Sequence, residues 1–184
     1  MKKLFLSAAA AASLTLSLVG VSVAAGPAIV NGSFETGTNP GAFVQLSAGD
    51  STTIQGWTVS AGTVDYIGTY WQAADGARSI DLSGTTARAI RQSFATTVGA
   101  TYKVTFSMSG NPAGGAGIKT MTVDAGGTPT GFSYEVPAVN PPTLTDMKWV
   151  TKTFSFTATA ATTTLTFTST TSGSFGPALD NVRV

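Results

Sequence analysis

The sequence predicts an all-β fold, an antiparallel β-sandwich of jelly-roll type. Short segments alternate apolar with polar residues, and clusters of Gly, Ser, Asn and Pro separate them. The 31 threonines and 21 glycines also favour strands and turns over helices. Because no segment shows the apolar spacing of a helix, short strands joined by turns remain, and these are typical of a sandwich.

The first 25 residues have the pattern of a secretory signal peptide. Lys2 and Lys3 give a positive start, residues 4–23 form an apolar run, and small residues follow at Ala24 and Ala25. A membrane anchor is the alternative, because the run is about long enough to span a bilayer. The many alanines of this run and the small residues at its end favour cleavage over anchoring. We therefore expect a secreted single domain over residues 26–184, without membrane insertion of the mature chain.

The charge and residue usage of the mature chain argue against several classes of partner and of active-site chemistry. Removing Lys2 and Lys3 from ten basic residues leaves eight against nine acidic ones, a net charge of −1. No basic patch is visible, so nucleic acid is a poor candidate partner. Cysteine is absent, which a domain of this size tolerates because its core is large enough without disulfides. Histidine, the commonest general base, is also absent.

Five segments show the period-two alternation of half-buried strands. In chain order they contain Ile80 and Leu82, residues 90–94, residues 102–108, residues 154–158, and Leu165 with Phe167. Turn clusters lie between them, at residues 83–86, 97–102, 109–117 and 123–131. The proline-containing segment 136–147 is predicted to be a surface connection. Trp57 and Trp149 stand beside strand patterns and are predicted to be core residues.

Several stretches of the mature chain resemble one known family. They are "NGSFE" (31–35), "GW" (56–57), "VDYIGTYWQAADGARSIDLSG" (64–84), "IRQSFATTVGATYKVTFSMSGNP" (90–112) and "GPALDNVRV" (176–184). In this order they resemble the choice-of-anchor C proteins, exported bacterial domains related to the plant cell-wall proteins of the domain-of-unknown-function 642 group. The resemblance covers nearly the whole mature chain. It implies a galactose-binding-like jelly roll, an architecture shared with many carbohydrate-binding modules.

The resemblance also implies a metal site. In related carbohydrate-binding jelly rolls, an N-terminal segment like "NGSFE" and the C-terminal strand lie side by side and hold a structural calcium. The matching carboxylates here are Glu35 and Asp180. Calcium takes six to eight hard oxygen ligands, and backbone carbonyls can complete such a set. The alternative is that Glu35 is a solvated turn residue and that Asp180 caps a turn.

One segment is predicted to bind a ligand. Residues 65–75 do not alternate, which indicates a loop with exposed aromatic rings. Flat apolar faces suit a pyranose ring, and amides or carboxylates suit its hydroxyls. The predicted ligand-binding residues are Tyr66, Tyr70, Trp71, Gln72 and Asp75. The alternative is that Trp71 tucks into the edge of the core and that the tyrosines cover it.

The sequence therefore predicts a secreted, non-catalytic carbohydrate-binding module for extracellular or cell-wall polysaccharide, with a structural calcium. The alternative is a structural or adhesive surface or matrix protein that does not recognise a specific sugar. A glycoside hydrolase would need two flanking carboxylates, for which Asp75 and Asp81 are the obvious pair. Without histidine or cysteine most nucleophilic triads are unavailable, so we do not expect an enzyme. The oligomeric state is left open.

Overall fold

The computed structural model describes residues 29–85 and 88–184, so the predicted signal peptide lies outside the described residues. The described chain forms strands and one 3-10 turn, η1 (Pro112–Gly114). The strands are β1 (Phe43–Ser47), β2 (Thr58–Ala61), β3 (Thr63–Ile67), β4 (Ser79–Asp81), β5 (Arg88–Ala95), β6 (Thr101–Gly110), β7 (Gly117–Asp124), β8 (Thr130–Val136), β9 (Val150–Thr157), β10 (Thr162–Ser169) and β11 (Pro177–Arg183).

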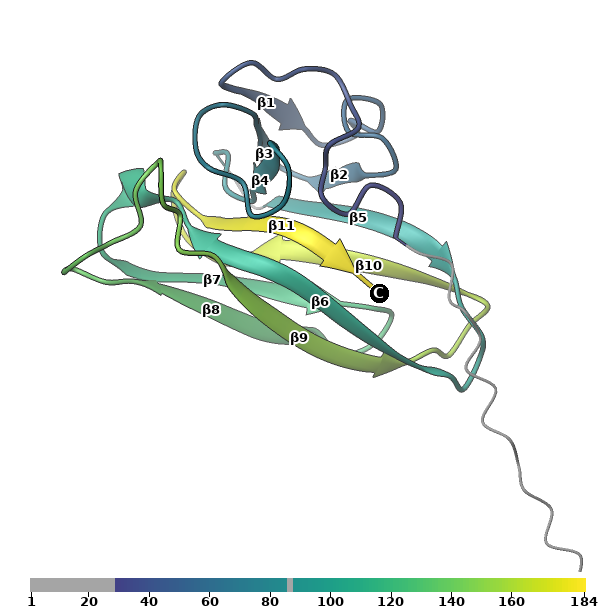
Figure 1. Cartoon of the computed structure of the whole chain (residues 1–184). Helices are drawn as coiled ribbons and strands as arrows, with labels where there is room; N and C mark the ends of the chain where they lie inside the picture. Colours follow the sequence, from purple (N-terminus) through teal and green to yellow (C-terminus); the bar gives the residue numbers. More distant parts are fainter. Residues whose placement is uncertain (1–28, 86–87) are drawn as a thin grey trace, which may run out of the picture.

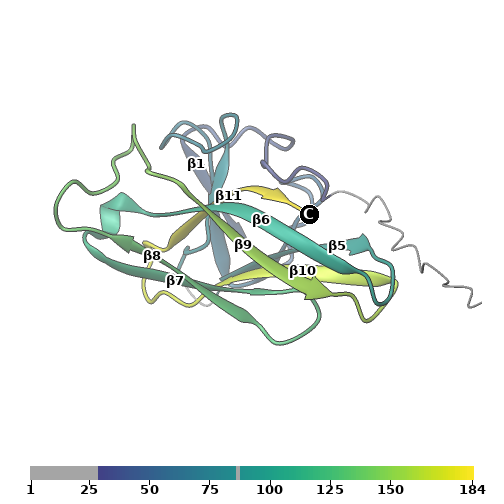
Figure 2. The ribbon, with the colours of Figure 1, turned by 60° about the horizontal axis from the view of Figure 1, so that its bottom comes forward.

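The strands form two antiparallel sheets that pack face to face (Figures 1 and 2). The six-stranded sheet has the order β1-β3-β4-β11-β6-β9, and the five-stranded sheet has the order β2-β5-β10-β7-β8. Strand β11, the last in the sequence, lies in the middle of its sheet between β4 and β6. The predicted all-β antiparallel sandwich is therefore confirmed.

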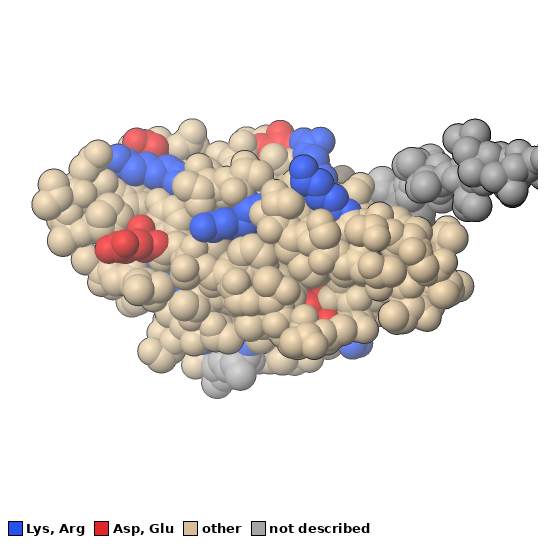
Figure 3. All heavy atoms as spheres, turned by 90° about the horizontal axis from the view of Figure 1, so that it is seen from below, with Lys and Arg blue, Asp and Glu red and all other residues tan. Residues whose placement is uncertain are grey.

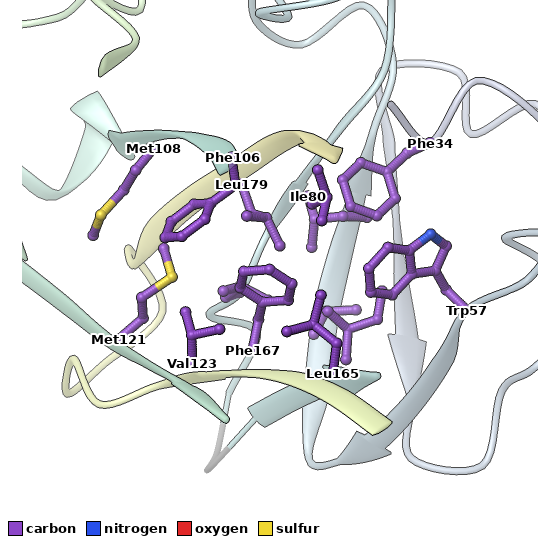
Figure 4. Close-up of a cluster of buried hydrophobic side chains, with 14 of the residues drawn as sticks. Phe34, Trp57, Ile80, Phe106, Met108, Met121, Val123, Leu165, Phe167 and Leu179 are labelled. Atoms are coloured by element: carbon purple, nitrogen blue, oxygen red, sulfur yellow. The ribbon is translucent and has the colours of Figure 1, made fainter. Parts of the chain in front are cut away.

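The core lies between the sheets, where the alternating apolar residues meet (Figure 4). The six-stranded sheet contributes Ile80, Phe106, Met108 and Leu179, and the five-stranded sheet contributes Met121, Val123, Leu165 and Phe167. Trp57 is buried between Phe34 and Phe167, with ring centroids 5.1 Å and 6.2 Å away. The prediction that Trp57 is a core residue is confirmed.

The two ends of the described chain meet. The N–H of Val182 in β11 donates to the Gly32 carbonyl oxygen at 2.8 Å. A side chain at position 32 would not fit, because a Cβ there would lie 1.9 Å from the Val182 carbonyl oxygen. The "NGSFE" segment and the C-terminal strand thus lie side by side, as predicted.

A smaller apolar cluster lies on the outer face of the six-stranded sheet. Its buried members are Ile67, Trp71, Met147 and Ala178, with Tyr70 and Trp149 packed against them. Met147 belongs to the segment 136–147, so this segment covers part of the sheet face instead of running only over the surface. Trp149 is half-buried in this outer cluster and lies outside the main core.

The surface carries few charges. On the face shown in Figure 3, most of the surface is formed by uncharged residues. Within residues 29–85 and 88–184 there is also no helix with the length and apolar character needed to cross a membrane.

Candidate ligand-binding pocket

A pocket of about 130 Å³ opens on the outer face of the six-stranded sheet, where β1, β3 and β4 lie next to the loop before β11. We call it the acidic-aromatic pocket. Its lining residues are Phe43, Asp65, Ile67, Tyr70, Trp71, Asp81, Asn111, Ser174 and Phe175. They come from segments far apart in the sequence, which the sandwich brings together.

Aromatic rings form the walls of this pocket. Phe43 is 50% exposed and Phe175 is 46% exposed, which is unusual for phenylalanine in a folded domain. The Tyr70 ring is half-buried and lies 5.4 Å from the Phe43 ring in an edge-to-face arrangement. The next ring, Trp71, is 5.7 Å from Tyr70 and is buried below it. The pocket therefore offers aromatic surface to a ligand.

Two carboxyl groups line the same pocket. Asp65 in β3 and Asp81 in β4 are direct cross-strand partners. Asp81 is fully buried, and its oxygens accept hydrogen bonds from the Asn111 amide at 2.7 Å and the Ser83 N–H at 2.8 Å. Asp65 is half-buried and accepts a longer bond from the Gln45 amide at 3.3 Å. Of the two, Asp65 is the one with more room to take a new partner.

The pocket raises the pKa of both carboxyl groups. Burial raises the pKa of Asp81 to about 7, and the nearby Asp65 adds to the increase, whereas the hydrogen bonds from Asn111 and Ser83 oppose it. Burial also raises the pKa of Asp65, and the Gln45 amide opposes that increase. Like charges directly opposite each other in a sheet are destabilising. The fold therefore holds an unfavourable pair at this site.

The loop that carries Phe175 is fixed from the other sheet. Arg88 at the start of β5 is buried, and its guanidinium donates to the carbonyl oxygens of Thr171 and Gly173. The hydroxyls of Ser83 and Ser169 also share a hydrogen bond of 2.9 Å at the base of this loop. These contacts hold one wall of the pocket in place.

A second depression, of about 330 Å³, adjoins the first because both are lined by Tyr70. Its other lining residues are Pro112, Ala113, Thr143 and Leu144. The segments 69–75 and 141–149 are joined here, since the Gln72 N–H donates to the Leu144 carbonyl oxygen at 2.8 Å. The two depressions therefore meet at Tyr70.

Two of the predicted ligand-binding rings are not exposed. Tyr66 is 0% exposed, because the alternation of β3 turns its ring into the core, where its hydroxyl donates to the Phe34 carbonyl oxygen at 2.6 Å. Trp71 is 4% exposed, and its indole N–H donates to the Ser79 hydroxyl at 2.7 Å. The expected exposure of these rings is wrong, because Tyr66 belongs to the main core and Trp71 to the smaller cluster on the outer face of the six-stranded sheet. Tyr70 and Trp71 nevertheless line the pocket.

Gln72 and Asp75, the other two predicted ligand-binding residues, do not line this pocket. Gln72 is exposed, and its carbonyl oxygen accepts the indole N–H of Trp149 at 2.9 Å. Asp75 forms an ion pair of 3.1 Å with Arg183 and lines a different depression beside the chain ends. Since Asp75 and Asp81 line separate pockets, the structure does not bring this candidate catalytic pair together.

Glu35 and Asp180 both bind the loop between β3 and β4. The Glu35 carboxylate accepts the N–H groups of Ala77 at 2.9 Å and Arg78 at 2.7 Å. The Asp180 carboxylate accepts the N–H groups of Ala74 at 2.7 Å and Asp75 at 2.9 Å. Burial raises the pKa of Asp180 to about 7 although these backbone N–H groups oppose it. The two carboxylates thus anchor one loop to both ends of the chain.

This pair fits a calcium site only in part. Carboxylate oxygens are the right donor type for calcium, but the loop presents N–H groups to them, which a cation would have to compete with. Among the described residues, no three or more His, Cys, Asp or Glu side chains cluster as metal ligands. Backbone carbonyls or water would have to complete the set, so calcium stays a prediction.

Sequence reasoning missed most of the pocket. Asp65 and Asp81 had a recognisable signal, because each is an acid inside a strand of alternating residues in a chain with only nine acidic residues. Phe43, Asn111 and Phe175 had none, since only the packing of distant loops brings them to the same place.

The sequence model for the protein of unknown function family (DUF642) matches residues 27–184. The chain belongs to the DUF642 family. A halomucin from Haloquadratum walsbyi is 34% identical over 162 residues, which is 85% of this chain but 2% of the halomucin. The DUF642 chain therefore spans a small fraction of that relative's length.

Two solved structures share the fold of this DUF642 protein. The CBM22-1-CBM22-2 tandem domain of Paenibacillus barcinonensis Xyn10C matches with a TM-score of 0.52 and 20% identity, over 86% of this chain and 45% of that one. An isomalto-dextranase from Arthrobacter globiformis complexed with panose matches with a TM-score of 0.51 and 14% identity, over 77% and 23%. These likenesses establish the sandwich fold.

Proposed function

We propose that this DUF642 protein is a secreted, non-catalytic carbohydrate-binding module for extracellular or cell-wall polysaccharide. The acidic-aromatic pocket carries the proposal. Phe43, Tyr70 and Phe175 offer apolar surface for a pyranose ring, and the half-buried Asp65 lies beside them to bind hydroxyls. The adjoining depression that shares Tyr70 gives room for a chain of sugar units.

The comparisons support the ligand class and the location. A CBM22 tandem domain and a panose-bound isomalto-dextranase share the fold, which favours a carbohydrate ligand. The signal-peptide pattern of residues 1–25 and the similarity to a halomucin favour secretion. Within DUF642, the motifs quoted above favour the choice-of-anchor C group.

A non-catalytic role fits the carboxyl groups. Asp75 is paired with Arg183 in a different depression, and Asp81 is fully buried with both oxygens hydrogen-bonded. We expect no release of reducing ends when the protein is incubated with a polysaccharide panel. Release from any member of the panel would contradict this part of the proposal.

Retention on a polysaccharide panel tests the proposed function. The wild type should be retained on at least one polysaccharide, and Phe43→Ala or Phe175→Ala should reduce retention without changing the melting curve, because both rings are half-exposed. Val98→Ala is the matched control, since Val98 is 64% exposed and lies outside the pocket. Failure of the wild type on every polysaccharide, or unchanged retention of both phenylalanine variants, would overturn the proposal.

One observation favours the structural or adhesive alternative. Strand β9 ends the six-stranded sheet, and its eight residues carry a single charge, Lys152. An edge strand of this kind can pair with a strand of another chain. If this is its role, light scattering should show concentration-dependent association without glycan. Strict monomer behaviour would count against it.

A structural calcium bound through Glu35 and Asp180 is the remaining part of the proposal. These side chains would supply carboxylate oxygens, and the metal would add a link between the two chain ends and the loop 74–78. The resemblance of the "NGSFE" segment and the C-terminal strand to calcium-holding jelly rolls supports it. Thermal melting in calcium and in chelator tests it.

A further inference from the structure

We infer that the acidic-aromatic pocket selects its glycan by charge: it prefers sugar units with a free amino group and rejects uronic acids. The inference rests on the proposed function and names the ligand class of the same pocket. It is carried by two features, the carboxyl groups and the aromatic rings, which favour the same charge.

The charged residues that line the pocket are all acidic. Asp65 and Asp81 are direct neighbours across β3 and β4, and the lining set includes no Lys or Arg. Two basic residues lie outside this lining set. The Arg88 guanidinium donates to the carbonyl oxygens of Thr171 and Gly173, and its charge also interacts with that of Asp81. A Cβ at Gly114 would lie 2.7 Å from the Nζ of the buried Lys119 and 2.4 Å from the Phe175 Cβ. Asp65 has neither cation as a hydrogen-bond partner, so the negative charge that a ligand meets in the pocket is that of Asp65.

The pair of carboxyl groups favours a cationic ligand over an anionic one. Two carboxylates side by side disfavour simultaneous ionisation, and the nearby Asp65 adds to the increase that burial causes in the pKa of Asp81. An ammonium group bound at the more accessible Asp65 would relieve this repulsion. A uronate would instead add negative charge to a partly buried site, where such charges are poorly screened.

The aromatic rings that form the walls of the pocket also favour a cationic ligand. The face of a phenyl or phenol ring attracts a cation through its quadrupole. Phe43, Tyr70 and Phe175 supply three such rings around the acids. An amino sugar has both parts that this arrangement recognises, a ring face for the aromatic surface and an ammonium for the carboxylates.

Two matched pairs of oligosaccharides test the inference by isothermal titration calorimetry. Glucosamine and N-acetylglucosamine oligomers share their ring and differ in the ammonium, and galactose and galacturonate oligomers differ in the carboxylate. We expect binding about five-fold tighter for glucosamine than for N-acetylglucosamine oligomers, and about five-fold weaker for galacturonate than for galactose oligomers, the order of one modest ion pair. Both differences should shrink as salt is raised.

A matched pair of variants separates the pocket from net charge. Asp65→Asn should abolish most of the preference, whereas Glu135→Gln, the same charge change at an exposed residue of β8 in the other sheet, should leave it unchanged. Equal loss in both variants, or an unchanged preference in Asp65→Asn, would overturn the inference. If the oligomers bind but show no preference for the ammonium and no penalty for the carboxylate, the inference is overturned and the proposed function stands. If none of the oligomers binds, the proposed function is overturned as well.

Discussion

Glu35 and Asp180 direct their oxygens at the N–H groups of one loop, whereas Asp65 and Asp81 face each other across two strands beside open space. The first pair, which we call the scaffold pair, binds backbone N–H groups and so fixes a loop, although burial still raises the pKa of Asp180 to about 7. The second pair brings like charges together in a pocket. The difference separates carboxylates that anchor a loop from carboxylates that face each other beside open space, and groups held at a cost to stability are typical of binding sites.

The largest expected effect comes from breaking the scaffold pair at Asp180. Asp180→Ala leaves the N–H groups of Ala74 and Asp75 without their acceptor in a partly buried loop. The expected loss is about 3 kcal/mol, roughly 6–12 °C in Tm for a domain of this size. Thermal melting against Glu135→Gln as control measures it. A loss below about 2 °C would show that the loop does not depend on this carboxylate.

Glu35→Ala should have a smaller effect. Glu35 also accepts two backbone N–H groups, but it is half-buried, so water can replace part of what is lost. We expect a loss of about 1 kcal/mol, or roughly 2–4 °C. A loss as large as that of Asp180→Ala would mean that the two carboxylates act as one unit, and a double variant would then be no worse than either single one.

Three buried or half-buried carboxyl groups should make the stability depend on pH. The folded-state pKa values of Asp65, Asp81 and Asp180 are raised, so the folded protein binds protons more tightly than the unfolded chain. Their contribution to stability is therefore greatest at acidic pH and falls as the pH rises through the raised pKa values, to about 7 for Asp81 and Asp180. Tm should decrease between pH 5 and pH 8.

Asp65→Asn should reduce this pH dependence only in part, because Asp81 and Asp180 remain, and it should raise Tm at pH 8 by about 2–4 °C, since it removes one of two neighbouring like charges. The same variant should lose charge-selective binding. Greater stability with weaker selection would be the signature of a carboxylate held for function. A destabilised Asp65→Asn protein would instead place Asp65 with the scaffold pair.

Calcium is expected to have the smallest effect on the melting curve, because the N–H groups of loop 74–78 already satisfy Glu35 and Asp180. Adding calcium after chelator should raise the wild-type Tm by a few degrees and leave Glu35→Gln unchanged. Identical wild-type curves in calcium and chelator would contradict the calcium proposal and leave the backbone hydrogen bonds as the role of this pair.

The sequence by itself determined the fold class and most strand positions. Alternation depends on the two-residue period of a strand, which is local, so the residue order alone places Val104 and Phe106 on the core face. It also determined that the "NGSFE" segment lies beside the C-terminal strand, through the resemblance of these motifs. The same rule could have placed Tyr66 inside, because alternation begins at Thr63 and runs through it.

Only the tertiary structure decided where a ligand could bind. The acidic-aromatic pocket joins residues from position 43 to position 175, and no local pattern encodes which loops will meet over a sheet face. The structure also decided the partners of the carboxylates, since Glu35 and Asp180 find N–H donors and Asp65 finds Asp81 only once β3, β4 and β11 pair. Burial and charge pairing depend on distant chain segments, whereas periodicity depends on neighbours.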